Sequence, residues 1–401
     1  MERETLGLDC GLGFCCNRYC PRCTFIVYRA PHWRVRFTGS KSADTILPDS
    51  AARTGILREG AIGSRPPKDL NLATASAMMN SPPVTLGAIQ EAQKRIVNVA
   101  YRTPLYLSPR LSALTGAKVY LKLELYQPIR VFKIRGAANK ILKLSPSERK
   151  RGLVAASSGN HGLAVSYLAK LTEVPATVVV PTTAVEEKLR AIEEYGATIV
   201  KHGLFHDERL AKALEIQKSS GAILVPPFDD PDIIAGQGTA GLEIVEDLPD
   251  VNMVLVPIGG GGLMAGVATA IKSLKPDVKM VGVEAEKAPK MAQSIKNGKI
   301  TRLENTTTIA DGLAVREPGV LTFELVKRFV DDFVLVSEEQ IEKGVYTIMR
   351  ECHLVVEPSA AAAVAGLLEK VRPKTGEKVV VVLSGGNISI KTLAAIISKY
   401  S

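Results

Sequence analysis

Lys133 is the residue of this chain whose surroundings best suit nucleophilic chemistry. It stands in the stretch Val131-Phe-Lys-Ile-Arg-Gly136, among apolar neighbours. An amine that is removed from water loses stabilisation of its charged form, so its pKa falls and more of it is present as the neutral nucleophile. A lysine in an apolar stretch can also extend its amine to solvent along its aliphatic stem. The motif by itself leaves a catalytic amine and a surface lysine as alternatives.

A run of four glycines, Gly259–Gly262, offers a site for an anion. The run follows the apolar stretch 254–258 and precedes a small-residue stretch that starts at Leu263. A strand that turns through glycines into a helix presents backbone N–H groups and the positive end of the helix dipole, which together suit a phosphate group. The run lacks the Lys-Ser or Lys-Thr ending of nucleoside-triphosphate loops and fits the dinucleotide motif poorly. A tightly packed turn without a ligand is the alternative.

Polar donors also gather in Ala155-Ala-Ser-Ser-Gly-Asn-His-Gly162, which follows a short apolar run. The side chains of Ser157, Ser158 and Asn160 suit a carboxylate or a phenolate at the start of a helix, as do the backbone N–H groups from Gly159 onward. A helix cap would account for one of these polar residues but not for all of them. We therefore expect a second anion-binding loop here.

A further candidate segment, Leu383-Ser-Gly-Gly-Asn387, ends another apolar run. The hydroxyl of Ser384 can donate to, or accept from, a ring nitrogen. These four segments are far apart in the sequence, so the elements between them must bring them together.

The elements between the segments are short apolar runs that alternate with helical stretches. Strands are expected at 119–123, 153–156, 176–180, 198–201, 253–258, 280–284 and 379–383, with helices such as 184–195 and 263–274 between them. Nearly continuous apolar strands that alternate with helices are typical of parallel sheets covered on both faces. Ligands bind such sheets at the carboxyl ends of the strands, where the candidate segments stand. We find no internal repeat.

Residues 1–79 differ from the rest of the chain. They hold five of the six cysteines, and Cys20-Pro-Arg-Cys23 has the two-residue spacing that lets both thiolates reach one zinc ion. They show no sustained helical or strand periodicity, and neither a secretory signal nor a transit peptide is indicated. We expect a disordered or non-native N-terminal extension, with a zinc module as the alternative.

Composition excludes several classes of protein. With 46% hydrophobic and 23% charged residues the chain is typical of a globular protein, and no run approaches the roughly 18 apolar residues of a membrane helix. The net charge of +10 is spread without a basic block, so we expect no nucleic-acid partner. Beyond residue 79 the chain holds only Cys352, a pattern of reducing compartments, so a cytoplasmic location is expected.

In this order, the four segments resemble those of the fold type II pyridoxal-phosphate enzymes, and specifically of the serine/threonine dehydratase group, which includes serine racemase. The resemblance runs from about residue 85 to residue 399 and includes Pro227-Phe-Asp-Asp-Pro231, Gly236-Gln-Gly-Thr239, Thr308-Ile-Ala-Asp-Gly312 and Val356-Glu-Pro-Ser359. It implies an α/β fold similar to the tryptophan synthase β subunit, with two open parallel-sheet lobes and the cofactor in the cleft between them. The large domain would comprise 80–145 and 233–401, and the small domain 146–232.

The resemblance also implies a role for each candidate residue. Lys133 would be the Schiff-base lysine and the proton-transferring base, and Ser158 would be the acid on the opposite face of the substrate if the enzyme racemises. The cofactor, pyridoxal 5′-phosphate, would be held by Phe132, Lys133, Asn160 (3′-oxygen), Gly259, Gly260, Gly261, Gly262 and Leu263 (phosphate) and Ser384 (pyridine nitrogen). The substrate carboxylate would be held by Ser157, Ser158, Gly159, Asn160 and His161.

The activity implied is β-elimination from a hydroxy amino acid: L-threonine to 2-oxobutanoate and ammonia, and L-serine to pyruvate and ammonia. Such a lyase would serve isoleucine biosynthesis or threonine catabolism, and a homodimer or homotetramer is expected. A serine racemase or a 3-hydroxyaspartate-type dehydratase on the same fold is the alternative, and a non-catalytic cofactor-binding protein is a more distant one.

The chain departs from the group's pattern at two places in the candidate region. Arg130-Val131 stand where members usually carry Gly-Ser, which removes a hydroxyl and adds a cation. Cation-dependent relatives bind a divalent ion through an acid at the position of Glu284 and another six residues later, where this chain has Lys290. We expect no metal, with the ammonium of Lys290 in its place; a Lys290 that points to solvent is the alternative. A C-terminal regulatory domain like that of allosteric threonine dehydratases is not expected.

Overall fold

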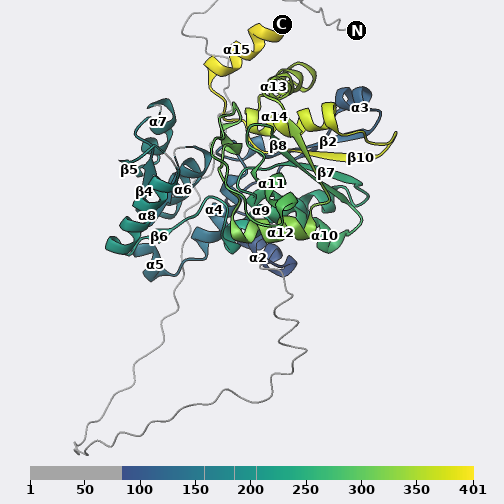
Figure 1. The fold of residues 1–401 in the computed structure, drawn as a ribbon. Helices are drawn as coiled ribbons and strands as arrows, with labels where there is room; N and C mark the ends of the chain where they lie inside the picture. The colour runs from purple at the N-terminus through teal and green to yellow at the C-terminus, as the bar shows by residue number, and fades with distance from the viewer. Residues whose placement is uncertain (1–83, 158, 185, 205) are drawn as a thin grey trace, which may run out of the picture. The chain divides into compact units, whose positions relative to one another are not determined.

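The computed structural model describes residues 84–157, 159–184, 186–204 and 206–401 (Figure 1). The chain divides into two units, Met1–Lys68 and Asp69–Ser401, and every described residue belongs to the second. The expectations for residues 1–79 therefore lie outside the described residues.

A six-stranded sheet forms the larger lobe, in the order β1-β2-β10-β7-β8-β9. Its strands are β1 (Leu105–Leu107), β2 (Lys118–Leu123), β7 (Met253–Pro257), β8 (Lys279–Ala285), β9 (Asp332–Val336) and β10 (Lys378–Leu383). All neighbours are parallel except β1 and β2, which are antiparallel. The sequence predicted a parallel sheet, so the antiparallel edge strand β1 is a difference from that prediction. The strand was missed because it has only three residues and no long apolar run.

A four-stranded parallel sheet forms the smaller lobe, in the order β5-β4-β3-β6. Its strands are β3 (Leu153–Ala156), β4 (Ala176–Val180), β5 (Thr198–Lys201) and β6 (Ile223–Leu224). The two sheets confirm the predicted fold class of two parallel-sheet lobes.

Helices cover both sheets. Those of the smaller lobe are α5 (Pro146–Lys150), α6 (Asn160–Thr172), α7 (Glu186–Glu194) and α8 (His206–Ser220). The others are α2 (Leu86–Ile96), α3 (Pro109–Thr115), α4 (Lys133–Leu142), α9 (Pro231–Asp247), α10 (Gly262–Leu274), α11 (Lys290–Asn297), α12 (Val320–Phe329), α13 (Glu338–Cys352), α14 (Pro358–Ala365) and α15 (Ile390–Tyr400). Short helical turns lie at Glu124–Tyr126 (η1), Asp311–Leu313 (η2) and Gly366–Lys370 (η3). Helix α4 packs against both α9 and α6 and so lies between the two lobes.

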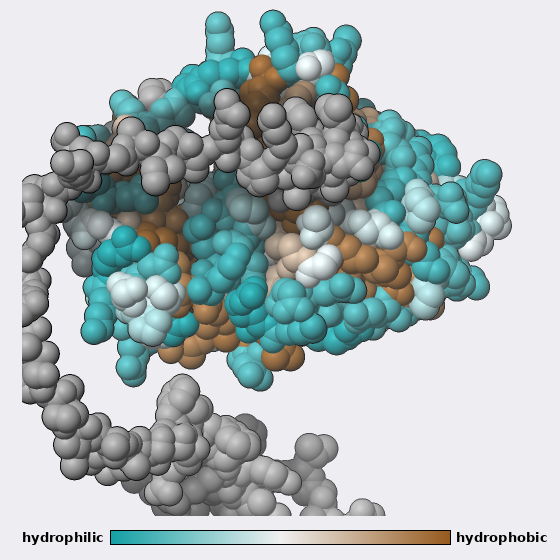
Figure 2. Space-filling view, turned by 90° about the horizontal axis from the view of Figure 1, so that it is seen from below, coloured by the Kyte–Doolittle hydropathy of each residue, from teal (hydrophilic) through white to brown (hydrophobic). Residues whose placement is uncertain are grey.

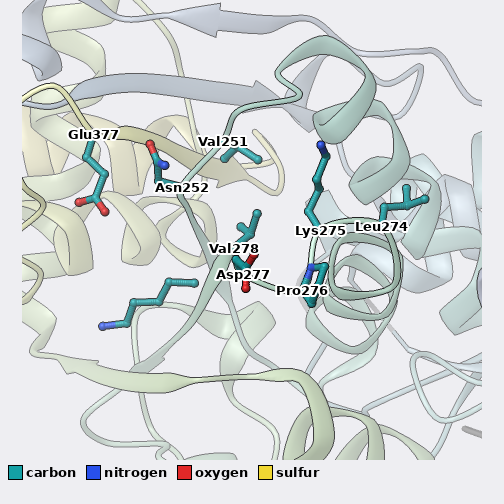
Figure 3. Close-up of a pocket in the computed structure, with 9 residues that line it drawn as sticks. Val251, Asn252, Leu274, Lys275, Pro276, Asp277, Val278 and Glu377 are labelled. Atoms are coloured by element: carbon teal, nitrogen blue, oxygen red, sulfur yellow. The ribbon is translucent and has the colours of Figure 1, made fainter.

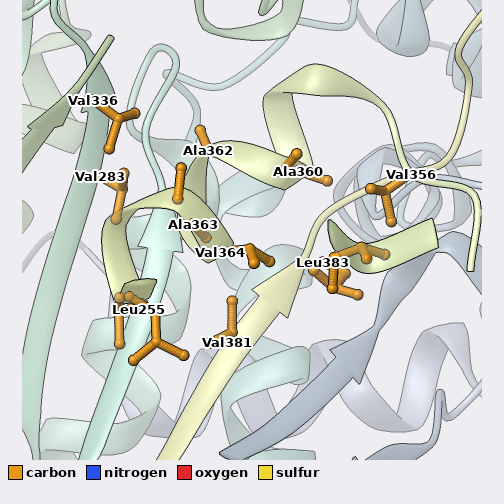
Figure 4. Close-up of a cluster of buried hydrophobic side chains, with 14 of the residues drawn as sticks. Leu255, Val283, Val336, Val356, Ala360, Ala362, Ala363, Val364, Val381 and Leu383 are labelled. Atoms are coloured by element: carbon orange, nitrogen blue, oxygen red, sulfur yellow. The ribbon is translucent and has the colours of Figure 1, made fainter. Parts of the chain in front are cut away.

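The central strands of the larger sheet enter two different hydrophobic cores. Leu255 and Val381 pack in the core that contains α14, whereas Val254 and Val380 pack in the core that contains α10. Successive side chains of a strand point to opposite faces, so a strand that is apolar throughout must be covered on both sides. Figure 4 shows the first core, where the alanine-rich helix α14 lies against the ends of the strands.

The outer surface is more polar than the cores. Figure 2 shows that the face seen from below in Figure 1 is mostly hydrophilic, with hydrophobic residues gathered in a few patches. Within the described part of the chain, every helix is too short or too polar to span a bilayer.

Candidate active site

Lys133 is the first residue of α4 and is only partly exposed. Its Nζ donates a hydrogen bond to the carbonyl oxygen of Pro227 at 2.5 Å and lies 5.2 Å from the centroid of the Phe132 ring. Burial lowers the pKa of Lys133 to about 8, although the negative charge of Glu357 acts in the opposite direction. A substantial fraction of the amine is therefore neutral at mildly alkaline pH, as a nucleophile or a general base requires.

A short ladder of backbone bonds holds Lys133 beside the Ser384 segment. The N–H of Phe132 donates to the carbonyl of Ser384 at 3.0 Å, and Val131 forms an antiparallel bridge with Gly385. Ser384 itself is 3% exposed. Arg130 adopts a left-handed backbone conformation, with φ of 59°, at the position where the resemblance led us to expect glycine. Two candidate segments separated by more than 200 residues thus lie side by side.

The glycine run lies where β7 ends and α10 begins. Gly261 has a φ of 100°, and a Cβ on Gly260 would lie within 2.4 Å of the Phe228 ring, so side chains are excluded from this turn. The carbonyl of Gly260 accepts a hydrogen bond from the Thr322 hydroxyl at 2.7 Å. Among the described residues, no acceptor pairs with the backbone N–H groups of Gly259, Gly260 and Gly261. The carbonyl of Gly260 is thus paired within the protein, whereas these N–H groups lie at the start of a helix without a described partner. A turn of this kind can bind a phosphate group.

The stretch after β6 connects Lys133 with the glycine run. Pro227 accepts the hydrogen bond from Lys133, and the ring of the next residue, Phe228, packs on Gly260. The carboxylate of Asp229 then accepts from the N–H groups of the first turn of α12, Val320 among them at 2.9 Å. Asp230 caps α9 in the same way. Each of these consecutive residues thus contacts a different element around the site.

Asn160 begins α6 and reaches the larger lobe. Its side-chain nitrogen donates to the carboxylate of Glu357, and its side-chain oxygen accepts from Asn387 at 2.9 Å. In the same loop the Ser157 hydroxyl accepts from the N–H of Gly159 at 3.3 Å. Ser158 lies outside the described residues.

His161 is turned into the smaller lobe. It is 3% exposed, and its Nε2 donates to the carbonyl of Val225 at 2.8 Å. Burial, together with the charge of Lys133, lowers the pKa of His161 to about 3, so the ring is neutral at physiological pH. Because its ring is paired with Val225, this residue can offer a substrate its backbone N–H rather than its side chain.

Glu357 is a site residue that the sequence analysis did not assign. It is 3% exposed, stands directly before α14, and its N–H donates to the carbonyl of Gly385 at 3.1 Å. Glutamate before the Pro358 at the start of a helix is an unusual cap, and its side chain makes no capping bond. That mismatch was the signal in the sequence that its carboxylate serves another purpose.

Lys290 is fully buried, so the alternative that it points to solvent is wrong. Its Nζ lies 2.9 Å from the Glu284 carboxylate and donates to the carbonyls of Ile258 at 2.7 Å and of Ala288 and Leu313 at 3.2 Å each. Burial lowers the pKa of Lys290, and Glu284 opposes that effect. The ammonium thus links Ile258, the residue before the glycine run, to Glu284 of β8 and Leu313 of η2.

A metal site or a separate cavity would be the alternative place for this chemistry. Within the ranges that the structure describes, no three His, Cys, Asp or Glu side chains form a group that could hold a metal ion. A hollow of about 340 Å³ lies at the opposite, amino-terminal edge of the larger sheet, lined by Val251, Lys275, Val278 and Glu377 among others (Figure 3). None of the candidate segments contributes to that hollow.

The chain is similar to known proteins in sequence and in structure. A family described as "Pyridoxal-phosphate dependent enzyme" matches residues 96–385. The L-threonine ammonia-lyase of Thermotoga maritima is 48% identical over 316 residues, which are 79% of this chain and 79% of that protein. The catabolic L-threonine dehydratase TdcB of Escherichia coli K12 is 42% identical over 316 residues, which are 78% of this chain and 96% of that protein. The structure of maize serine racemase has a TM-score of 0.75 and 35% identity, covering 79% of this chain and 98% of that one.

Proposed function

The chain belongs to the pyridoxal-phosphate-dependent enzymes, in the serine/threonine dehydratase family, and from that premise we propose that it deaminates L-threonine to 2-oxobutanoate and ammonia and L-serine to pyruvate and ammonia. The observation that carries the proposal is the partly buried amine of Lys133 beside a glycine turn whose N–H groups have no acceptor among the described residues. The identity of 48% to an L-threonine ammonia-lyase supports threonine as the substrate.

The described residues fit pyridoxal 5′-phosphate. The N–H groups of Gly259 to Leu263 would hold the phosphate, the hydroxyl of Ser384 the ring nitrogen, and the Phe132 ring would lie near the cofactor. Asn160 would hold the 3′-oxygen, although its amide nitrogen already donates to Glu357. When bound, the cofactor supplies an aldehyde that condenses with amino groups and a ring that delocalises the electrons left by α-proton removal.

Lys133 moves the proton. Its neutral amine accepts the α-proton of the substrate at Nζ, and the low pKa that burial gives it keeps this form available. The hydroxyl of Ser384 would give the ring nitrogen a neutral partner rather than a carboxylate, so the ring would withdraw electrons less strongly. With Ser384 in that role, loss of the β-hydroxyl would be favoured over transamination.

The substrate carboxylate would be bound by the backbone N–H groups of the loop from Ser157 to His161 at the start of α6, where the helix dipole favours a negative charge.

Loss of the α-proton and the β-hydroxyl removes one water from threonine. Hydrolysis of the released 2-amino-2-butenoate then adds one water, which gives 2-oxobutanoate and ammonia.

Racemisation of serine is the second candidate, and the likeness to maize serine racemase favours it. It would need an acid on the face of the substrate opposite Lys133, and Ser158 is our candidate. We further propose a cytoplasmic homodimer or homotetramer that serves threonine catabolism or isoleucine biosynthesis. The large domain would comprise 80–145 and 233–401, and the small domain 146–232.

Purified holoenzyme incubated separately with L-threonine, L-serine, D-serine and 3-hydroxyaspartate tests these assignments. Measurement of 2-oxoacid and ammonia, with chiral chromatography of the remaining amino acid, separates elimination from racemisation. We expect 2-oxobutanoate and ammonia in equal amounts from L-threonine. Turnover of 3-hydroxyaspartate alone, or D-serine from L-serine without 2-oxoacid, would contradict the proposal.

A further inference from the structure

Four buried charged side chains gather around the start of α4 and take no part in the reaction described above. Lys122, Glu124, Arg135 and Glu243 are each at most 4% exposed. They come from β2, η1, α4 and α9, and we call them the ionic cluster. With two cations and two anions, the cluster is neutral as a whole.

Arg135 is the centre of the ionic cluster. Its guanidinium donates to the carboxylate of Glu124 through Nε and Nη2, at 2.8 Å each. It donates to the carboxylate of Glu243 through Nη1 and Nη2, at 2.7 and 2.8 Å. Nη1 also donates to the Thr239 hydroxyl at 3.0 Å. The five N–H donors of arginine are thereby all used, in two forks that a lysine cannot reproduce.

The remaining members complete the pairing. Lys122 donates to Glu243 at 2.6 Å and to the carbonyl of Thr103 at 2.7 Å. Glu124 accepts from the Thr103 hydroxyl at 2.6 Å and from Gln127 at 3.2 Å. A buried ion pair adds little net stability compared with apolar packing, but it restricts the geometry of the groups it joins. The cluster is therefore better suited to fixing positions than to adding stability.

The position that the cluster fixes is the start of α4. This helix has no side-chain N-cap, and the N–H of Gly136 donates instead to the side chain of Gln237 in α9. Gly136 and Gly236 bring the two helices so close that a Cβ on Gly236 would lie 2.6 Å from the Cα of Gly136. In the sequence, Arg135 lies two residues after Lys133 and directly before Gly136, where the two helices cross.

The cluster also reaches the strand beside Ser384. Lys122 lies in β2 opposite Val382 of β10, and Leu123 lies opposite Leu383, the last residue before Ser384. The same four charges thus join the helix that starts with Lys133 to the strand pair that ends at Ser384.

We propose that Arg135 is a positioning residue that, through its two carboxylate forks, fixes the place of the Lys133 amine relative to Ser384. This inference rests on the proposed function, since it takes Lys133 as the catalytic amine. Catalysis is sensitive to such placement, because a displacement of about 1 Å can lower a rate by about 10²-fold.

The test compares Arg135→Lys, which keeps the charge and loses the forks, with two controls. Lys143→Ala changes an exposed cation at the other end of α4, and Ile348→Ala removes buried volume from α13, so it lowers the melting temperature without touching the cluster. In Arg135→Lys we expect kcat to fall about 10²-fold while KM changes less than about 3-fold. In the cofactor-free protein, pH-dependent acylation of Lys133 followed by peptide mapping should show its pKa rising from about 8 towards its ordinary value, because the amine loses its fixed buried position.

A second variant guards against simple misfolding. Arg135→Gln combined with Glu124→Gln removes one cation and one anion together, so the cluster stays neutral, and we expect the same changes in kcat and in the pKa of Lys133. A lower melting temperature with both quantities unchanged, as in Ile348→Ala, would overturn the inference. The acylation experiment needs no substrate, so a wrong assignment of substrate cannot be mistaken for a wrong assignment of Arg135.

Discussion

The side-chain nitrogen of Asn160 lies 2.8 and 3.1 Å from the two carboxylate oxygens of Glu357, across 197 residues of sequence. One residue begins a helix of the smaller lobe, and the other precedes a helix of the larger lobe. The contact therefore joins the two lobes within the candidate active site, and it places a negative charge where it acts on Lys133.

Replacing Glu357 by Gln should lower the pKa of Lys133 below its value of about 8, because the carboxylate is the group that opposes the effect of burial. The amide keeps an oxygen that can accept from Asn160. The pH dependence of Lys133 acylation in the cofactor-free protein measures the change, with Glu338→Gln in α13 as the control. An unchanged or higher pKa in Glu357→Gln would show that the charge does not act on Lys133.

Lys133 should carry the cofactor. Borohydride reduction of the holoenzyme followed by peptide mapping should find the pyridoxyl adduct on Lys133, and Lys133→Ala should lose essentially all turnover while its melting temperature stays within a few degrees of wild type. Lys140, in the same helix but paired with Asp230, is the matched control and should remain unlabelled. An adduct on any other lysine would remove the basis of the assignment.

The buried ammonium of Lys290 should make activity independent of divalent cations, because a cation bound to four oxygens of the protein already occupies this place. Chelator treatment should leave activity and melting temperature unchanged. Lys290→Met should lower the free energy of unfolding by about 3–5 kcal/mol, since it leaves the Glu284 carboxylate buried without its counter-charge. Lys290→Met combined with Glu284→Gln should lose less. Activity that chelation abolishes and magnesium restores would falsify this expectation.

Stability should decrease in mild acid because of His161. Its pKa is about 3 in the folded protein against 6.5 for an ordinary histidine, so between these values the unfolded chain binds the extra proton. The stabilisation is complete above pH 6.5 and is lost as the pH falls towards 3. From pH 6.5 to 5 this one group should lower the free energy of unfolding by about 2 kcal/mol.

Denaturant unfolding of wild type and His161→Gln over that pH interval measures the effect. Glutamine can still donate to the carbonyl of Val225 but does not titrate. The variant should have the shallower pH dependence, and parallel curves for the two proteins would show that His161 does not contribute.

Local patterns in the sequence predicted the parts of the site that depend on neighbours along the chain. The glycine turn after β7 and the polar loop after β3 follow apolar runs that proved to be strands, and Ser384 ends another. Strand β6 was missed because two residues show no periodicity. Strand β9 was missed although its residues 333–336 form a short apolar run, which was not assigned.

Contacts between distant segments could not be predicted in this way. Glu357 meets Asn160, and Arg135 meets Glu243, only because the fold brings together residues more than 100 positions apart. An arginine two positions after the lysine is ordinary in a sequence, and a glutamate before a proline shows only that the start of a helix is unusual. The buried partners of the two residues give them their roles. For Lys290, the neighbouring sequence could not distinguish a fully buried ammonium from an exposed one.

The stretch from Pro227 to Asp230 limits what insertions the chain can accept. Surface loops usually tolerate added residues because few partners depend on their length. Here four consecutive residues each have a separate partner: the amine of Lys133, the backbone of Gly260, the first turn of α12 and the first turn of α9. One inserted residue would shift all later members out of register at once, so this connection has a fixed length although it contains neither helix nor strand.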